Sequence, residues 1–242
     1  MADAPAGGSR EARHPGHGFA RGVRVLWAAA RRRDVAVVYA AIVTVVTVGL
    51  GIMPRAVADD LVLSSSTNLV NLRQHPPLVL IASAFVEPSI AGLVLVLPLV
   101  WVLGMVQLWL GRAAVLTVVA LGHVGVTVFV ATLLAAGINQ GRVALVEATA
   151  TDVGVSYGLV AALGLLAARV SKSRRPWYVL AMTGGFVLVL LVNRSFTDLG
   201  HVVAWLLGLA LSLLVVRGAA TTERHDRCQQ GAGPGKSPSS VR

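Results

Sequence analysis

Two short motifs bring residues with catalytic chemistry to the starts of two apolar stretches. They are Gly154-Val-Ser156-Tyr157-Gly158 and Gly200-His201, the latter followed by Gly208. A serine hydroxyl becomes a nucleophile when a neighbouring base accepts its proton, and histidine, which titrates near neutral pH, suits that role. An ionisable side chain inside an apolar span is costly, so His201 is a functional candidate by its position alone. The motifs therefore predict nucleophilic chemistry by Ser156 and His201.

The composition predicts the setting of that chemistry. The chain has 242 residues, of which 55% are hydrophobic and 13% charged, and its mean hydropathy is +0.74. A soluble domain this apolar would have too little polar surface, so we expect an all-α integral membrane protein. Six apolar stretches are long enough to span a bilayer, near 35–53, 89–111, 113–136, 153–170, 177–193 and 200–217. A shorter run, 78–86, predicts a re-entrant or interfacial element in a first loop over 54–88.

The distribution of charge predicts the orientation. With a cytoplasmic N-terminus, all of the 21 Lys and Arg residues lie inside except Arg55, Arg73, Arg142 and Arg194. The positive-inside rule favours this arrangement and places both termini in the cytoplasm. The domain boundaries follow: a basic, disordered segment 1–33, a six-helix membrane domain 34–217 and a disordered tail 218–242. Spans four and six then run from outside to inside, which puts Ser156 and His201 at similar depth near the outer face.

The basic and apolar segments are less consistent with two other interpretations. The run after Arg33, with Ala56-Val57-Ala58 behind it, could be a cleaved signal peptide, but it is longer than the usual core of one. The net charge of +10 does not predict nucleic-acid binding, because the basic residues flank apolar spans instead of forming one patch. Frequent Arg, Ala, Val, Gly and Leu indicate a high-GC bacterial genome, so we expect a multi-pass protein of the bacterial plasma membrane.

Small residues predict how the fourth and sixth spans pack. They recur every four positions at Gly154, Gly158 and Ala162, and at Gly200, Ala204 and Gly208. Small faces let membrane helices approach closely, and if these two faces meet, a Ser156–His201 hydrogen bond follows. Both motifs also follow a Thr-Asp pair. The simpler interpretation is that the Thr or the Asp of each pair, Thr151-Asp152 or Thr197-Asp198, caps the helix that follows. The sharper interpretation is that Asp198 orients the imidazole.

These motifs resemble those of the rhomboid intramembrane serine proteases, in particular a divergent actinobacterial branch. That family has a Gly-x-Ser-Gly motif opening its fourth helix and a His-x-x-Gly-x-x-x-Gly motif on its sixth. Here Tyr157 and Ala204 replace one glycine in each. The segment from Leu80 to Ser89 is similar to the family's approach to its second helix. The resemblance implies a Ser156–His201 dyad, with Gly154, Tyr157 and Gly158 shaping the site and the Ser156 N–H binding the oxyanion.

The second helix departs from the family pattern. The family's His and Asn, which help to bind the oxyanion, correspond to Gly92 and Val96, neither of which donates a side-chain hydrogen bond. The family's tyrosine beside the histidine corresponds to Val160, and Tyr157 is a candidate substitute. Glu87 falls where the family often has another histidine. An ionised carboxylate there would repel an oxyanion, whereas a protonated one could donate to it.

Three functions remain open from the sequence. The first is a serine protease that cleaves transmembrane proteins in the lipid bilayer. The second is an inactive pseudoprotease that binds or retains such proteins, and the third is a small transporter with His123, Glu87 and Asp152 as relay groups. No metal-ligand cluster or nucleotide-binding motif occurs in the sequence, so we expect no metal site, no cofactor and no nucleic-acid partner.

Overall fold

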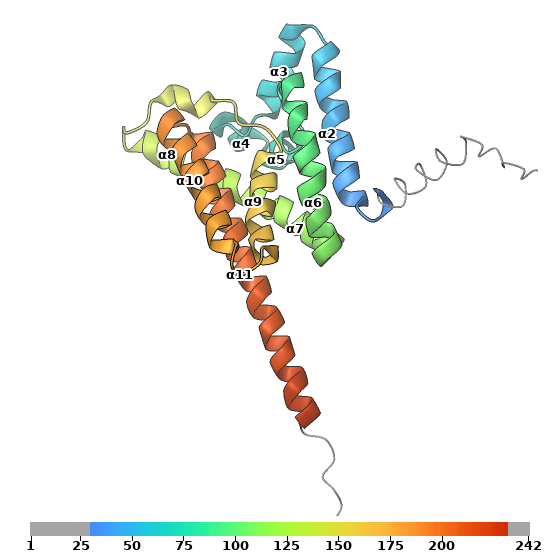
Figure 1. Ribbon diagram of the computed structural model, residues 1–242. Coiled ribbons are helices and arrows are strands. Elements are labelled where there is room, and N and C mark those ends of the chain that lie inside the picture. The colour runs from blue at the N-terminus through green and yellow to red at the C-terminus, as the bar shows by residue number, and fades with distance from the viewer. Residues whose placement is uncertain (1–29, 232–242) are drawn as a thin grey trace, which may run out of the picture.

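The computed structural model describes residues 30–231, and every regular element among them is helical (Figure 1). The first half contains α2 Asp34–Ile52, α3 Arg55–Ser65, α4 Leu69–Gln74, α5 Pro76–Ser83, the 3-10 helix η1 Ile90–Leu95 and α6 Val96–Leu110. The second half contains α7 Arg112–Ala120, the π-helical η2 Leu121–Gly125, α8 Val126–Asn139, η3 Leu145–Thr149, α9 Ser156–Leu166, η4 Ala167–Arg169, α10 Arg175–Asn193 and α11 Phe196–Gly231.

Five helical segments are long and apolar enough to cross a membrane. They are Asp34–Ile52, Ile90–Leu110, Arg112–Asn139, Arg175–Asn193 and Phe196–Gly218, and each corresponds to a predicted span. The predicted fourth span is shorter, Ser156–Arg169, because residues 151–155 are not helical. The protein is therefore a multi-pass membrane protein that is all-helical over residues 30–231, and α9 differs from its other apolar membrane helices in its length.

Helix α9 lies in the middle of the bundle, packed against α6, α7 and α11 (Figure 1). Nine of its residues are buried: Tyr157, Gly158, Leu159, Val160, Ala161, Ala162, Gly164, Leu165 and Leu166. Helix α10, by contrast, buries none of its residues and packs along α11. Large apolar side chains are exposed on α2 and α10, as expected of surfaces that face lipid. The site at the start of α9 is thus built on the most enclosed helix of the bundle.

The first loop folds into the short helices α3, α4 and α5 and is tied to the bundle. The Tyr39 hydroxyl donates to the carbonyl of Ala84 at 2.7 Å, and the N–H of Gly154 donates to the carbonyl of Ser83 at 3.0 Å. Val79 and Ser83 on α5 are buried. The end of the first loop therefore supports the segment that leads into α9.

The predicted tail from residue 218 is wrong in part, because α11 continues to Gly231. The sequence after Gly218 contains helix-forming Ala, Glu, Arg and Gln residues and no proline before Pro234, so nothing local ends the helix at the membrane boundary. In Figure 1 this part of α11 projects beyond the other helices. The predicted segment 1–33, apart from its last four residues, and residues 232–242 lie outside the described residues.

Candidate active site

The structure brings Ser156 and His201 together. Ser156 is the first residue of α9, and His201 lies in the second turn of α11. Their Oγ and Nε2 atoms are 2.9 Å apart, a hydrogen-bond distance. The Ser156 residue is half-buried, and 22% of the His201 side chain is exposed. The geometry suits transfer of the serine proton to the imidazole.

Helices α9 and α11 run in the same direction and touch where side chains are smallest. A Cβ added to Gly200 would lie 2.5 Å from the ring of Tyr157. One added to Gly164 would lie 2.6 Å from the carbonyl oxygen of Trp205, and one added to Gly208 would lie 2.8 Å from the Cα of Gly164. These separations are too short for real Cβ atoms, so the absence of side chains lets the helices approach and fixes the relative depth of the dyad.

The face of α9 that meets α11 differs from the predicted one of Gly154, Gly158 and Ala162. Gly154 precedes the helix, and a Cβ on Gly158 would contact Val119 of α7 at 3.3 Å. The contact with α11 is made instead by Tyr157, Ala161 and Gly164, which helical periodicity places on one face. On α11 the predicted residues Gly200 and Gly208 do contact α9, and Ala204 between them is fully buried.

Aromatic rings surround the imidazole of His201. The Tyr157 ring packs edge-on against it with centroids 5.3 Å apart, and the ring of Phe186 on α10 lies 6.4 Å away in a stacked arrangement. Tyr157 thus occupies the position next to the histidine for which the sequence made it a candidate. Val160, which is also buried, contributes no aromatic ring. The rings restrict the orientations that the imidazole can adopt.

Asp152 joins three parts of the chain instead of capping α9. The residue before α9 is Val155, and it makes no side-chain cap. The Asp152 carboxylate accepts hydrogen bonds from the Tyr157 hydroxyl at 3.1 Å, from Thr197 at 3.3 Å and from Thr67 at 3.2 Å. The capping interpretation of Asp152 was therefore wrong. The Thr-Asp pair before each motif made Asp152 a candidate in the sequence. No local pattern identifies its partner Thr67, which lies in the first loop.

Asp198 belongs to the cap of α11. The N–H of Asp198 donates to the Ser195 oxygen at 3.0 Å, which makes Ser195 the N-cap, and the Ser195 hydroxyl donates to Asp198 Oδ2 at 2.6 Å. The nearest approach of Asp198 to the imidazole is 3.8 Å, from Oδ1 to Nδ1 of His201. This distance is too long for a hydrogen bond, so Asp198 acts on the imidazole through its charge alone.

Gly154 shapes the turn into the site. Its φ of +128° lies in a region that side chains strongly disfavour, and its N–H is held by the carbonyl of Ser83. The turn delivers Ser156 to the first position of α9, where no carbonyl one turn earlier in the helix can accept the Ser156 N–H. This N–H is available to a negatively charged oxygen near the serine.

A family model described as rhomboid-like protein matches residues 29–222. The chain belongs to the rhomboid-like family. No curated protein and no solved structure matches it. The match covers every membrane-crossing helix together with Ser156 and His201, so the resemblance carried by these motifs is confirmed at the level of the family.

The two residues that the resemblance aligns with the family's oxyanion-binding His and Asn lack polar side chains. Gly92 lies in η1 and Val96 is the first residue of α6, packed against the apolar core. A Cβ on Gly92 would overlap the Glu87 side chain, and one on Gly154 would lie 3.6 Å from Glu87 Oε2. Glu87 therefore fills the space beside Gly92 and reaches the turn that precedes Ser156. Sequence reasoning noted its position but not this proximity.

His123 forms a second, separate serine–histidine contact. It lies in the π-helical segment η2, and its Nε2 is 2.9 Å from the Ser83 hydroxyl and 3.1 Å from the Leu80 carbonyl. Ser83 and His123 are both buried, with exposures of 0% and 5%. The position of His123 near the middle of the third span favours a neutral, hydrogen-bonded core histidine over part of a proton path, and these contacts support the core interpretation.

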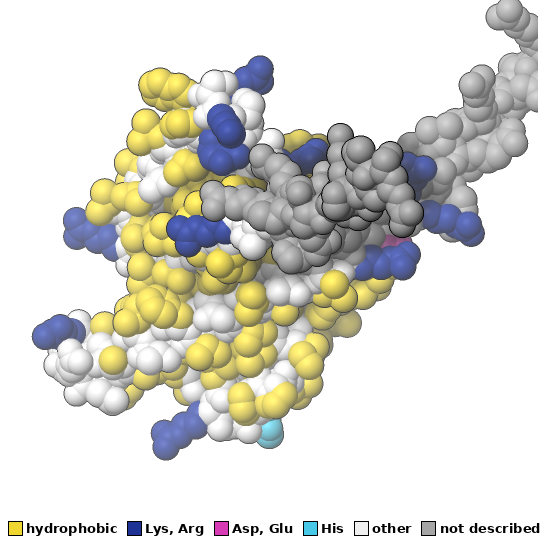
Figure 2. Space-filling model, turned by 90° about the horizontal axis from the view of Figure 1, so that it is seen from below, with side chains coloured by type: hydrophobic (Ala, Val, Ile, Leu, Met, Phe, Trp, Pro, Cys, Tyr) yellow, Lys and Arg dark blue, Asp and Glu magenta, His cyan; other side chains and the backbone are white. Residues whose placement is uncertain are grey.

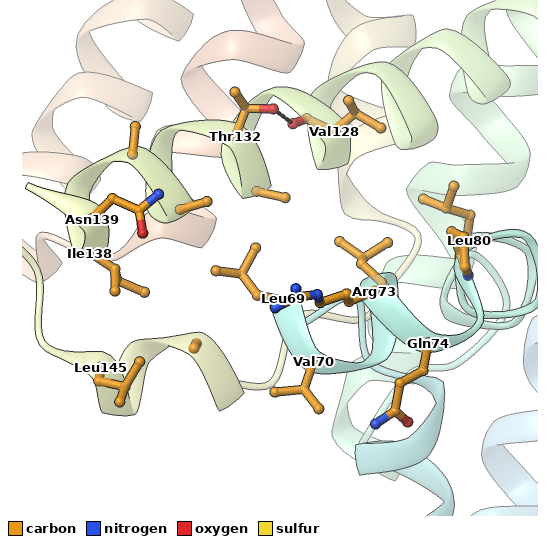
Figure 3. A pocket seen from close by; sticks show the side chains of 16 residues that line it. Leu69, Val70, Arg73, Gln74, Leu80, Val128, Thr132, Ile138, Asn139 and Leu145 are labelled. Carbon is orange, nitrogen blue, oxygen red and sulfur yellow. Dashed lines mark hydrogen bonds between the residues drawn. The ribbon is translucent and has the colours of Figure 1, made fainter.

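A large pocket, shown in Figure 3, has neither residue of the dyad in its lining. It has a volume of about 990 Å³ and is lined by α4, α8 and η3, mainly with apolar side chains such as Leu69, Val128 and Leu145. Arg73 is its charged residue. Among the side chains that the structure describes, which end at Thr221, no group of three or more from His, Cys, Asp or Glu could hold a metal ion.

Proposed function

We propose that this rhomboid-like protein is a serine endopeptidase that cleaves transmembrane proteins within the membrane. Ser156 is the nucleophile, and His201 is the general base and then the general acid. The observation that carries the proposal is the 2.9 Å contact between Ser156 Oγ and His201 Nε2. A nucleophile and a base in this contact, at the start of an enclosed helix, are the arrangement that covalent catalysis needs.

The length of α9 supports a site below the membrane surface. Ser156–Arg169 is roughly 20 Å long at about 1.5 Å per residue, whereas the hydrocarbon core is about 30 Å thick. If the end of α9 lies near the cytoplasmic face, its start lies on the order of 10 Å below the outer face. The polar groups of Asp152, Thr67 and Thr197 lie beside the start of α9 and make its surroundings hydrophilic, as a hydrolytic site requires.

The proposed reaction has an acylation step and a hydrolysis step, and both use Ser156 and His201. Ser156 Oγ attacks the scissile carbonyl carbon while His201 Nε2 accepts the hydroxyl proton, and the carbonyl oxygen becomes an oxyanion that the Ser156 N–H binds. The C–N bond then breaks, and the imidazolium gives its proton to the leaving amine. Water, deprotonated by His201, then attacks the acyl carbon, the bond from that carbon to Ser156 Oγ breaks, and the imidazolium returns its proton to Oγ. The substrate is a transmembrane segment that unwinds near its outer end, because a continuous helix shields its peptide bonds.

For the topology we propose six spans, with α9 as the fourth and both termini in the cytoplasm of a bacterium. The start of α2 and the end of α11 lie on the same side of the bundle (Figure 1). Arg112 at this end pairs with Asp34, and Arg169 stacks on Trp109. Figure 2, a view from this side, has Lys and Arg side chains around a largely hydrophobic surface. This distribution supports a cytoplasmic side for residues before 34 and after 217 and a first loop over 54–88 at the outer leaflet.

Fluorophosphonate labelling of the purified full chain in detergent tests the proposal. Wild type is compared with Ser156→Ala and His201→Ala, with thermal unfolding as the control for folding. Labelling of wild type that disappears in both variants supports an activated serine. A folded wild type that does not label would refute the protease.

A pseudoprotease that binds membrane proteins is the second candidate. Gly92 and Val96 favour it, because neither supplies a hydrogen bond to an oxyanion. The loss of one such donor costs about 10²–10³ in rate. Capture of the same transmembrane proteins by wild type and by Ser156→Ala, with no labelling of either, would favour this function over the protease.

A further inference from the structure

Attack by Ser156 creates a negative oxygen that needs more than one donor. The Ser156 N–H supplies one hydrogen bond, and oxyanion sites commonly use two or more. The neighbouring Gly154 N–H is already bound to Ser83, and Gly92 and Val96 have no polar side chain. A second donor must therefore come from another residue near the turn before α9.

Glu87 lies beside the turn that presents Ser156. Its carboxyl group occupies the space that a side chain on Gly92 would fill, and its Oε2 is 3.6 Å from the position of a Cβ on Gly154. Gly154 precedes Ser156 by two residues in a turn whose conformation is held by Ser83. The carboxyl group thus lies between η1 and the turn that presents the nucleophile.

The surroundings of Glu87 favour its neutral form. The residue is half-buried, and burial raises the pKa of its carboxyl group. Among the described residues no Lys or Arg pairs with Glu87, and no hydrogen bond engages its carboxyl group. An unpaired, half-buried carboxyl group retains its proton more readily than an exposed one and then has an O–H to donate.

We propose that Glu87, as a neutral carboxylic acid, donates a hydrogen bond to the oxyanion formed during attack by Ser156. This role rests on the proposed protease function and replaces the donors missing at Gly92 and Val96. The proton stays on Glu87 throughout, so the residue stabilises charge without taking part in proton transfer. A protonated carboxyl group in an apolar site is an established type of oxyanion donor in other enzymes.

Labelling rates with a fluorophosphonate test this role, because attack on the probe also places negative charge on an oxygen. Glu87→Ala is expected to lower the maximal labelling rate by about 10²–10³ with little change in the probe concentration for half-maximal rate. Glu87→Gln keeps an N–H donor and is expected to stay within roughly tenfold of wild type. Asp60→Ala, which removes an exposed carboxylate on α3, is the control and should leave the rate unchanged.

A second pair of variants uses the space shared by Glu87 and Gly92. Gly92→His in the Glu87→Ala background restores a donor in the vacated space and should raise the rate at least about tenfold over Glu87→Ala. Gly92→His alone should not raise the rate, because its Cβ would overlap Glu87. Thermal unfolding in detergent shows which variants are folded.

The outcomes separate this role from the function on which it rests. Wild-type labelling together with an equal rate for Glu87→Ala would overturn the role of Glu87 and leave the protease intact. The role of Glu87 would also be overturned if Glu87→Gln and Glu87→Ala were both folded and labelled equally slowly. Side-chain packing, and not hydrogen-bond donation, would then explain the loss of labelling. Absence of labelling in a folded wild type would overturn the protease and the role of Glu87 together.

Discussion

The hydroxyl of Tyr157 donates a hydrogen bond to the carboxylate of Asp152, with 3.1 Å between Oη and Oδ1. The ring of the same tyrosine packs edge-on against His201. One side chain therefore connects the polar network at the start of α9 with the proposed catalytic base. Its ring and its hydroxyl have separable roles.

Tyr157→Phe should separate these roles. Because the ring contact with His201 remains, the labelling rate should fall by less than about tenfold. Loss of the hydrogen bond to the Asp152 carboxylate should lower the free energy of unfolding by about 1.5–3 kcal/mol. Tyr157→Ala also removes the ring and should reduce labelling much further. Labelling kinetics and thermal unfolding of the two variants measure both effects. Equal, severe losses of labelling would contradict the separation.

Gly208→Ala should destabilise the contact between α9 and α11. The added Cβ would overlap the carbonyl oxygen of Ala161 and lie 2.8 Å from the Cα of Gly164. Because these are backbone atoms, the overlap can be relieved only if the two helices move apart. Overpacking of this kind costs about 1–3 kcal/mol. Gly185→Ala on α10 is the matched control, because nothing lies within 4 Å of its Cβ and alanine favours a helix by about 0.5–1 kcal/mol. A melting temperature for Gly208→Ala at or above that of the control would refute the contact.

Apolar length predicted most of the fold, because a helix in lipid must satisfy its own backbone hydrogen bonds over the whole bilayer. The five long spans therefore match the predicted stretches closely. The start of α9 was misplaced because hydropathy continues through Val153 and Val155, whereas the positive φ of Gly154 and its bond to Ser83 keep this segment out of the helix. The end of α11 was missed because nothing in the sequence requires a helix to end at the membrane surface.

The sequence predicted those parts of the site that depend on the spacing of residues close together in the chain. Ser156 and His201 stood out because polar residues inside apolar spans are rare and these two follow similar motifs. Small residues indicated close packing, but periodicity does not identify the neighbour, so Gly158 was assigned to α11 although it faces α7. The contact of Asp152 with Thr67 joins residues far apart in the chain, and no local pattern reveals it.

Asp198→Asn should have little effect on labelling. The sequence suggested that this carboxylate orients His201, which would make the variant nearly inactive, but the 3.8 Å separation is not a hydrogen bond. The cap made by Ser195 also survives this change, because the N–H of residue 198 still donates to Ser195 and the Asn oxygen still accepts from its hydroxyl, so we expect a rate within about tenfold of wild type and little loss of stability. Ser195→Ala removes the cap itself and should lower the free energy of unfolding by about 0.5–2 kcal/mol. A loss of labelling of about 10⁴, as when the orienting carboxylate of a triad is replaced, would restore the original hypothesis.

The pH dependence of labelling should distinguish a protonated Glu87 from an ionised one. Burial raises the pKa of this carboxyl group, and the donor exists only below that raised value. Wild-type labelling should therefore decline as pH rises through the pKa of Glu87, whereas Glu87→Gln should show no such decline. His201 must be unprotonated in both proteins, and Asp152 and Asp198 are also common to both, so the ratio of the two rates isolates Glu87.

The stability of the protein should change in the same pH window and with the same sign. Because the folded-state pKa of Glu87 lies above its unfolded value, the folded state binds this proton more tightly. The resulting stabilisation is present below the unfolded pKa and is lost as pH rises through the folded pKa. The melting temperature of wild type relative to Glu87→Gln should therefore fall over this window, in parallel with the labelling ratio. A ratio that stays constant, or that rises with pH, would mean that Glu87 works as a carboxylate or not at all.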